Sequence, residues 1–197
     1  MTSRTAFVLL LGLAGCASQQ SAEPEPPPPA KTKAANVAAP ATTTSESCDV
    51  SVVRLLSIPH EPPSVSDVRA VCGEPVPVLI AVADDAGRPG FERLRALSLL
   101  GRFETSAARG ALLRASKSGD LASIRRTAVE ALSHHPASTA RNDALRAALK
   151  DPDPHVRLAA TRALAADESQ ETRAALTEAG RVETEPFVKK ELDSATR

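Results

Sequence analysis

The apolar and polar positions of this chain repeat every 32 residues from Glu74 to residue 197. Written in blocks of 32, this part of the chain aligns with itself four times without a gap. Three columns of the alignment are mainly apolar: Leu100, Leu132 and Leu164; Ala96, Ala128 and Ala160; and Ile80, Leu112, Ala144 and Leu176. Self-similarity at one fixed spacing of this length is the signature of a protein built from stacked structural repeats.

Each block predicts a pair of helices, and the third block shows this most clearly. Its first helix carries apolar residues at helical spacing, namely Ala144, Leu145, Ala148 and Leu149. Asp153 is expected to cap the second helix, with Pro154 in the first helical position, where a missing N–H costs nothing. One face of that second helix holds Val156, Ala159, Ala160, Ala163 and Leu164. A helix pair of this kind cannot bury its own apolar face, so we expect neighbouring pairs to stack.

Residues 48–73 predict two short helices ahead of the repeats, over 49–58 and 64–71, separated by a Pro-rich turn. Cys48 precedes the first of these helices and Cys72 ends the second. The two ends of a helical hairpin can lie side by side, so a Cys48–Cys72 disulfide is predicted. Two buried free thiols are the alternative. We interpret this segment as an N-terminal cap on the repeats.

The phrase Asp-Pro-Asp-Pro-His-Val-Arg-Leu-Ala-Ala at 151–160, followed by Ala163-Leu164, resembles the second half of a HEAT repeat. The short period is most similar to the HEAT-like repeats of phycobilin lyases and many bacterial scaffold proteins. The resemblance covers 74–197 and implies an all-α fold, a right-handed α-solenoid of helical hairpins. Asp193 and Thr196 replace apolar residues in the last block, as expected of a terminal repeat that faces water. No lyase activity is carried over, because the match lies in the repeat and not in catalytic residues.

Three sets of basic residues recur through the repeats. The first set shares one column of the alignment: Arg93, Arg125, Arg157 and Lys189. In HEAT-like families the basic residue at this position commonly pairs with acidic turn residues and carbonyls of neighbouring repeats, so the resemblance implies that these four residues form a structural ladder. A basic stripe for an acidic partner is the alternative. Residues expected to face outward on the second helices, and so to contact a partner, are Arg95, Arg126, Arg162 and Lys190. A third set near the helix starts gains nothing from the helix dipole and is a further candidate for partner contact: Arg109, Arg141 and Arg173.

The beginning of the chain has the pattern of an export signal. One basic residue, Arg4, precedes a short apolar run at 7–13, and small residues then lead to Cys16. The run is too short to span a bilayer. The sequence Leu-Ala-Gly-Cys at 13–16 resembles the lipobox of bacterial lipoproteins, which implies removal of residues 1–15 and lipidation of Cys16, for example with palmitate. An ordinary secretory signal with a chance cysteine is the alternative.

Residues 16–47 are interpreted as a disordered tether rich in Pro, Ala and Thr. The stretch at 23–29 favours polyproline II, and the remainder lacks apolar periodicity. At ~3.1 Å per residue an extended tether of this length reaches roughly 90 to 100 Å. A Pro-rich ligand for a partner domain is the alternative interpretation.

Composition and motifs argue against several functions. The 24 basic residues balance the 24 acidic ones, which disfavours a nucleic-acid partner. The chain has no Trp or Tyr and only four Phe, so aromatic platforms for sugars are scarce. We find no metal-ligand spacing such as HExxH or CxxC, no GxSxG elbow, no phosphate-binding glycine loop and no SxxK. The sequence therefore predicts no catalytic residues, no metal, no cofactor and no small-molecule substrate.

The expected function is that of a membrane-anchored envelope lipoprotein that binds a protein partner without being an enzyme. A passive structural or assembly component of an envelope complex is the main alternative, and an enzyme subunit is a further one. Ala17 and Ser18 stand where many inner-membrane lipoproteins carry Asp. By that analogy we expect the outer membrane, with the protein facing the periplasm, and the cell surface as the alternative.

Overall fold

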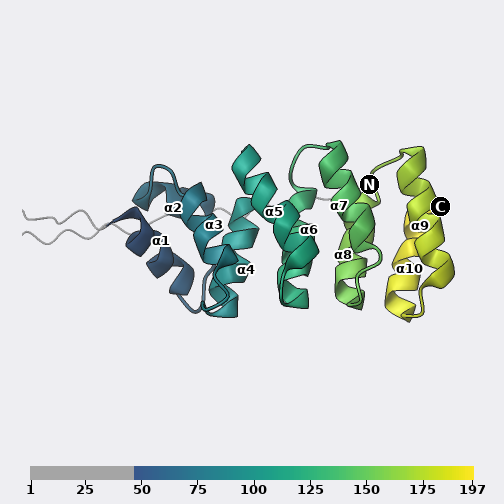
Figure 1. Cartoon of the computed structure of the whole chain (residues 1–197), viewed down its shortest axis with the longest axis horizontal. Helices are drawn as coiled ribbons and strands as arrows, with labels where there is room; N and C mark the ends of the chain where they lie inside the picture. Colours follow the sequence, from purple (N-terminus) through teal and green to yellow (C-terminus); the bar gives the residue numbers. More distant parts are fainter. Residues whose placement is uncertain (1–46) are drawn as a thin grey trace, which may run out of the picture. The chain divides into compact units, whose positions relative to one another are not determined.

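The computed structural model describes residues 47–197. These residues form ten α-helices and no strand (Figure 1). In chain order the helices are α1 (Cys48–Ser57), α2 (Val65–Val71), α3 (Val76–Asp84), α4 (Gly90–Leu100), α5 (Ser106–Ser118), α6 (Ala122–Ser133), α7 (Thr139–Ala148), α8 (Pro154–Leu164), α9 (Gln170–Val182) and α10 (Pro186–Ala195). The predicted signal peptide at 1–15, the lipidation residue Cys16 and the tether up to Glu46 lie outside the described residues.

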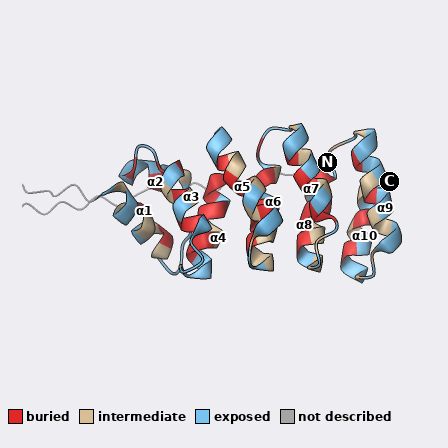
Figure 2. Ribbon diagram, in the orientation of Figure 1, coloured by how far each residue is buried: buried red, intermediate tan, exposed pale blue. Residues whose placement is uncertain are grey.

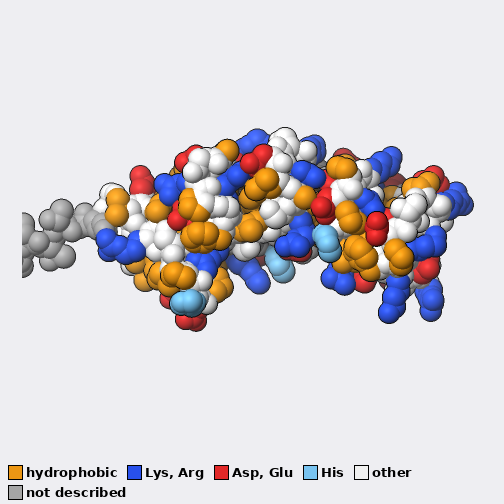
Figure 3. Space-filling model, turned by 90° about the horizontal axis from the view of Figure 1, so that it is seen from below, with side chains coloured by type: hydrophobic (Ala, Val, Ile, Leu, Met, Phe, Trp, Pro, Cys, Tyr) orange, Lys and Arg blue, Asp and Glu red, His pale blue; other side chains and the backbone are white. Residues whose placement is uncertain are grey.

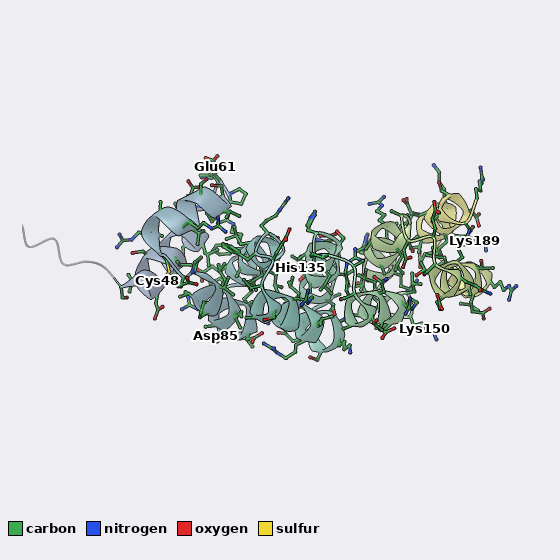
Figure 4. All side chains as sticks on the ribbon, turned by 90° about the horizontal axis from the view of Figure 1, so that it is seen from above. Cys48, Glu61, Asp85, His135, Lys150 and Lys189 are labelled. Carbon is green, nitrogen blue, oxygen red and sulfur yellow. A yellow bond between two sulfur atoms is a disulfide. The ribbon has the colours of Figure 1, made fainter. Side chains whose placement is uncertain are left out.

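The helices from α3 onward form four hairpins that stack side by side, and each hairpin corresponds to one 32-residue block. The second helices α4, α6, α8 and α10 contact one another in sequence, and the first helices α3, α5, α7 and α9 do the same. Figure 4 shows the two rows, with Asp85 and Lys150 at the edge of the first helices and Lys189 at the edge of the second. The all-α solenoid expected from the repeat is confirmed.

Short polar side chains fix where the helices begin. Thr105, Ser138 and Ser169 precede α5, α7 and α9, and each side-chain oxygen accepts a hydrogen bond from the backbone N–H three residues later. Asp153 caps α8 in the expected way, with Pro154 in the first position. Such caps satisfy N–H groups that have no partner inside the helix, so the hairpin turns are specified locally.

The core runs between the two rows as a continuous apolar layer, which appears as the inward-facing red bands in Figure 2. Its fully buried members include the leucine and alanine columns of the repeat: Leu100, Leu132 and Leu164, with Ala96, Ala128 and Ala160. The small residues let the second helices approach closely. At Gly101 a side-chain Cβ would lie only 2.9 Å from the Cβ of Ala131 on α6. The hairpins therefore depend on each other for burial.

Helices α1 and α2 cover the first hairpin. Val52, Leu56 and Val68 are fully buried there, and α1 contacts both α3 and α4. Cys48 and Cys72 are joined by a disulfide, with their Cα atoms 4.9 Å apart. Within the described part of the chain no helix is both long and apolar enough to cross a bilayer.

Candidate protein-binding face

The ladder column connects each hairpin to the next through paired arginine and carboxylate groups. Each guanidinium makes two hydrogen bonds, at 2.7 to 3.0 Å, to an acidic residue in the turn of the following repeat. The pairs are Arg93 with Asp120, Arg125 with Asp151 and Arg157 with Glu183. Two parallel bonds of this kind are among the stronger polar contacts in proteins.

The same cations also satisfy backbone oxygens at the ends of the preceding first helices. Arg93 donates to the carbonyl of Ala83 at 3.2 Å, and Lys189 donates to the carbonyl of Gly180 at 2.8 Å. The hydrogen bonds from Arg157 lower the pKa of the Glu183 carboxyl from 4.5 to about 2. The arginines of this column are therefore neutralised inside the protein.

Arg95, expected to contact a partner, is bonded to the N-terminal cap inside the protein, and its contact with a partner stays a prediction. Its guanidinium donates to the carbonyl oxygens of Leu56 at 2.7 Å, of Pro59 at 3.1 Å and of Ile58. The last carbonyls of a helix have no partner inside it. Arg95 supplies donors to the end of α1 and so attaches the cap to α4.

Arg141 is also bonded inside the protein and is buried, and its contact with a partner stays a prediction. It donates to the carbonyl of Leu132 at 2.9 Å and to that of Ser133 at 3.2 Å. Burial lowers the pKa of this guanidinium. Although Arg141 lies near the start of its own helix, it meets the end of α6, where carbonyl oxygens favour a cation. Arg109 is half-buried on α5 and Arg173 is exposed on α9, and their contact with a partner stays a prediction.

Three of the expected cations are accessible on consecutive second helices: Arg126 on α6, Arg162 on α8 and Lys190 on α10. Arg126 lies 3.7 Å from a carboxylate oxygen of Glu130, and Arg162 lies 3.4 Å from one of Glu191. Ion pairs this exposed contribute little to stability. We call the outward surface of α6, α8 and α10 the second-helix face.

A groove of about 640 Å³ lies between α6 and α8 on this face, and we call it the α6–α8 groove. Its lining combines charged, polar and apolar side chains: Arg126, Glu130, Ser133, His134, Arg141, His155, Leu158, Ala159, Arg162, Ala163 and Ala166. Beside it, the ring of His155 stacks on Phe187 of α10 with centroids 5.3 Å apart. Figure 3 shows Lys, Arg and His side chains along the margin of the second helices, with hydrophobic side chains among them.

The histidines of the described residues do not come together as metal ligands. His135 is buried between the rows, with its Nε2 3.1 Å from the carbonyl oxygen of Leu100 (Figure 4). Among residues 47–197 no group of three or more His, Cys, Asp or Glu side chains could hold a metal ion.

The HEAT repeat family model matches residues 143–166, which cover most of α7 and all of α8. The stacked hairpins and this match define an α-solenoid with HEAT-like repeats. No curated protein sequence matches the chain at a significant level.

Several solved structures share the fold. The complex of CpcE and CpcF of phycocyanin lyase from Nostoc sp. matches with a TM-score of 0.53 and 14% identity, over 75% of this chain and 99% of that one. Human deoxyhypusine hydroxylase matches with a TM-score of 0.52 and 26% identity, over 70% of this chain and 48% of that one. A computationally designed armadillo repeat protein for peptide recognition matches with a TM-score of 0.48 and 15% identity, over 73% and 79%. These likenesses show a shared fold of stacked helical hairpins.

Proposed function

We propose that this protein is a membrane-anchored envelope scaffold that binds a protein partner through its second-helix face. The observation that carries the proposal is the contrast between two sets of cations. The ladder arginines are held by bidentate bonds inside the protein, whereas Arg126, Arg162 and Lys190 are accessible on neighbouring helices. Exposed cations without strong internal partners complement an acidic surface and speed its association.

The anchoring part of the proposal rests on the lipobox-like sequence that ends at Cys16 and on the Pro-rich tether after it. The Cys48–Cys72 disulfide supports an oxidising compartment, since such bonds persist outside the cytosol. We propose the outer membrane, with the repeats in the periplasm. Replacement of Cys16 by Ser should move the protein from the membrane fraction to the soluble fraction, and retention in the membrane would refute the lipid anchor.

We propose a binding role rather than a catalytic one because the second-helix face presents exposed cations and, among residues 47–197, no paired nucleophile and base. Its exposed cations recognise charge, and the single hydroxyl in the α6–α8 groove, on Ser133, donates to the backbone oxygen of Glu130 at 2.6 Å. A nucleophile instead needs a base within hydrogen-bond reach.

Crosslinking in intact cells tests the proposed partner. The double variant Arg126→Ala/Arg162→Ala should lose the crosslinked protein while its circular dichroism spectrum stays unchanged. A matched control, Arg114→Ala/Arg181→Ala, removes two exposed cations from the first helices and should retain the partner. Equal loss in both variants would point to net charge rather than to this face. Absence of any specific protein in the wild type would favour a passive structural component.

A further inference from the structure

The α6–α8 groove, of about 640 Å³, brings charged and apolar side chains together on the second-helix face. Arg126 and Glu130 line it from α6, and His155 and Arg162 line it from α8. Side chains of Leu158, Ala159 and Ala163 add an apolar surface between these polar groups. The groove therefore offers charge recognition on both walls and apolar contact between them.

The charges of the groove are unbalanced. Three arginines line it against one carboxylate, that of Glu130, and a second carboxylate, that of Glu191, lies 3.4 Å from Arg162 beside the groove. Arg141 is held by the carbonyls at the end of α6 yet still contributes positive potential. The groove consequently attracts anions more strongly than cations.

One nitrogen of the Arg126 side chain, Nε, is buried and has no hydrogen-bond acceptor within residues 47–197. The nearest paired oxygen, on Glu130, is 3.7 Å away, which is beyond hydrogen-bond distance. The neighbouring Arg125, by contrast, has its Nε 2.7 Å from a carboxylate oxygen of Asp151. The Nε of Arg126 is shielded from solvent, but the Arg126 side chain as a whole is 42% exposed, so a ligand meets the rest of the guanidinium, which no strong internal bond holds.

We infer that the α6–α8 groove binds carboxylate side chains of an acidic, extended segment of the partner protein. This inference rests on the proposed function and names the chemistry of its partner. Arg126 and Arg162 bind the carboxylates from opposite walls, and the apolar surface accepts an apolar side chain between them. Phe187, which is 41% exposed and stacked under His155, extends the apolar contact toward α10. The apolar surface between the cations favours a peptide over a lipid phosphate, which needs no such contact.

Fluorescence anisotropy with two labelled synthetic peptides tests this. One peptide alternates Glu with Leu, and the other carries Gln in place of every Glu. The full-length protein should bind the Glu peptide about tenfold more tightly at low ionic strength, and the preference should shrink as salt screens the charges. The variant Arg126→Gln/Arg162→Gln should lose the preference. The charge-matched control Arg114→Gln/Arg181→Gln should keep it.

Equal affinity for the two peptides, or equal loss in both variants, would overturn the inference. Vesicles of phosphatidylglycerol form a second arm of the experiment. Vesicle binding that disappears in Arg126→Gln/Arg162→Gln, without any peptide preference, would assign the groove to lipid phosphates instead. If crosslinking places a protein partner on the second-helix face but acidic peptides gain nothing, the groove inference fails and the proposed function stands. If no partner crosslinks to the face while the Glu peptide still binds, the proposed function fails instead.

Discussion

Two arginines on α8 should differ sharply in what they contribute to stability, although they are only five residues apart. Arg157 makes two hydrogen bonds to Glu183 and two more to the carbonyls of Asp151 and Pro152, and its side chain is 17% exposed. Arg162 has one pair, with Glu191, and its side chain is 62% exposed. Replacing each with Ala separates the structural ladder from the proposed binding face.

The magnitude of the Arg157→Ala effect follows from what the change leaves behind. The side chain of Glu183 is only 4% exposed, so its carboxylate stays largely buried when the cation is removed. Removing one partner of a buried ion pair costs about 3–5 kcal/mol. Backbone N–H groups of Thr184 and Glu185 still donate to Glu183 at 3.0 and 2.9 Å, which places the expected loss near the lower end, about 3 kcal/mol. Arg162→Ala should change the free energy of unfolding by less than about 0.5 kcal/mol.

Urea denaturation followed by circular dichroism measures both values. A loss of about 3 kcal/mol is a large part of the 5–15 kcal/mol typical of whole domains, so Arg157→Ala should unfold at clearly lower urea concentration. Equal losses for the two variants would refute the division between ladder and face. A cost confined to Arg162→Ala would show that the assignment of the two arginines is reversed.

Three further predictions concern the packing, the ladder and the cap. Gly101→Ala should destabilise the protein by about 1–3 kcal/mol, because the new Cβ would come within 3.0 Å of the α6 backbone. Gly110→Ala inside α5 should instead stabilise it by about 0.5–1 kcal/mol, because Ala is the better helix residue and its Cβ meets only Arg114 at 3.9 Å. The urea midpoints of the two variants should therefore shift in opposite directions. Because Glu183 has a pKa of about 2 instead of 4.5, its contribution is complete above pH 4.5 and should fall by about 3 kcal/mol as the pH drops to 2. Glu183→Gln should remove that part of the acid sensitivity. Reduction of the Cys48–Cys72 bond, which closes a separation of 24 residues, should cost about 2–4 kcal/mol, and unchanged thermal unfolding in reductant would contradict this.

The stacking of the repeats could be predicted from the sequence because every 32-residue block has to bury the same apolar positions. Each hairpin must bury the same column, such as Leu100, Leu132 and Leu164, so the period alone specifies helix pairs that stack. Local caps such as Asp153 could also be recognised, because a cap depends only on residues within one turn of the helix.

The roles of individual cations could not be obtained in the same way. A column gives the position of a side chain on its own helix but not the neighbour that it meets. Arg95 meets the carbonyls at the end of α1, which lies outside the repeat, and Arg141 meets the end of α6. The α6–α8 groove was missed for a related reason. Arg126 and Arg162 occupy different columns, and their common groove becomes visible only when the two helices are placed side by side.

Photo-crosslinking from single positions in living cells tests the binding face most directly. A photoreactive residue is placed at position 126, 162 or 190 on the second helices, and at position 114 or 181 on the first helices as controls. We expect one and the same protein to be captured from the three second-helix positions and not from the two controls. Capture that is equal on both rows, or confined to the first helices, would contradict a partner bound on the second-helix face.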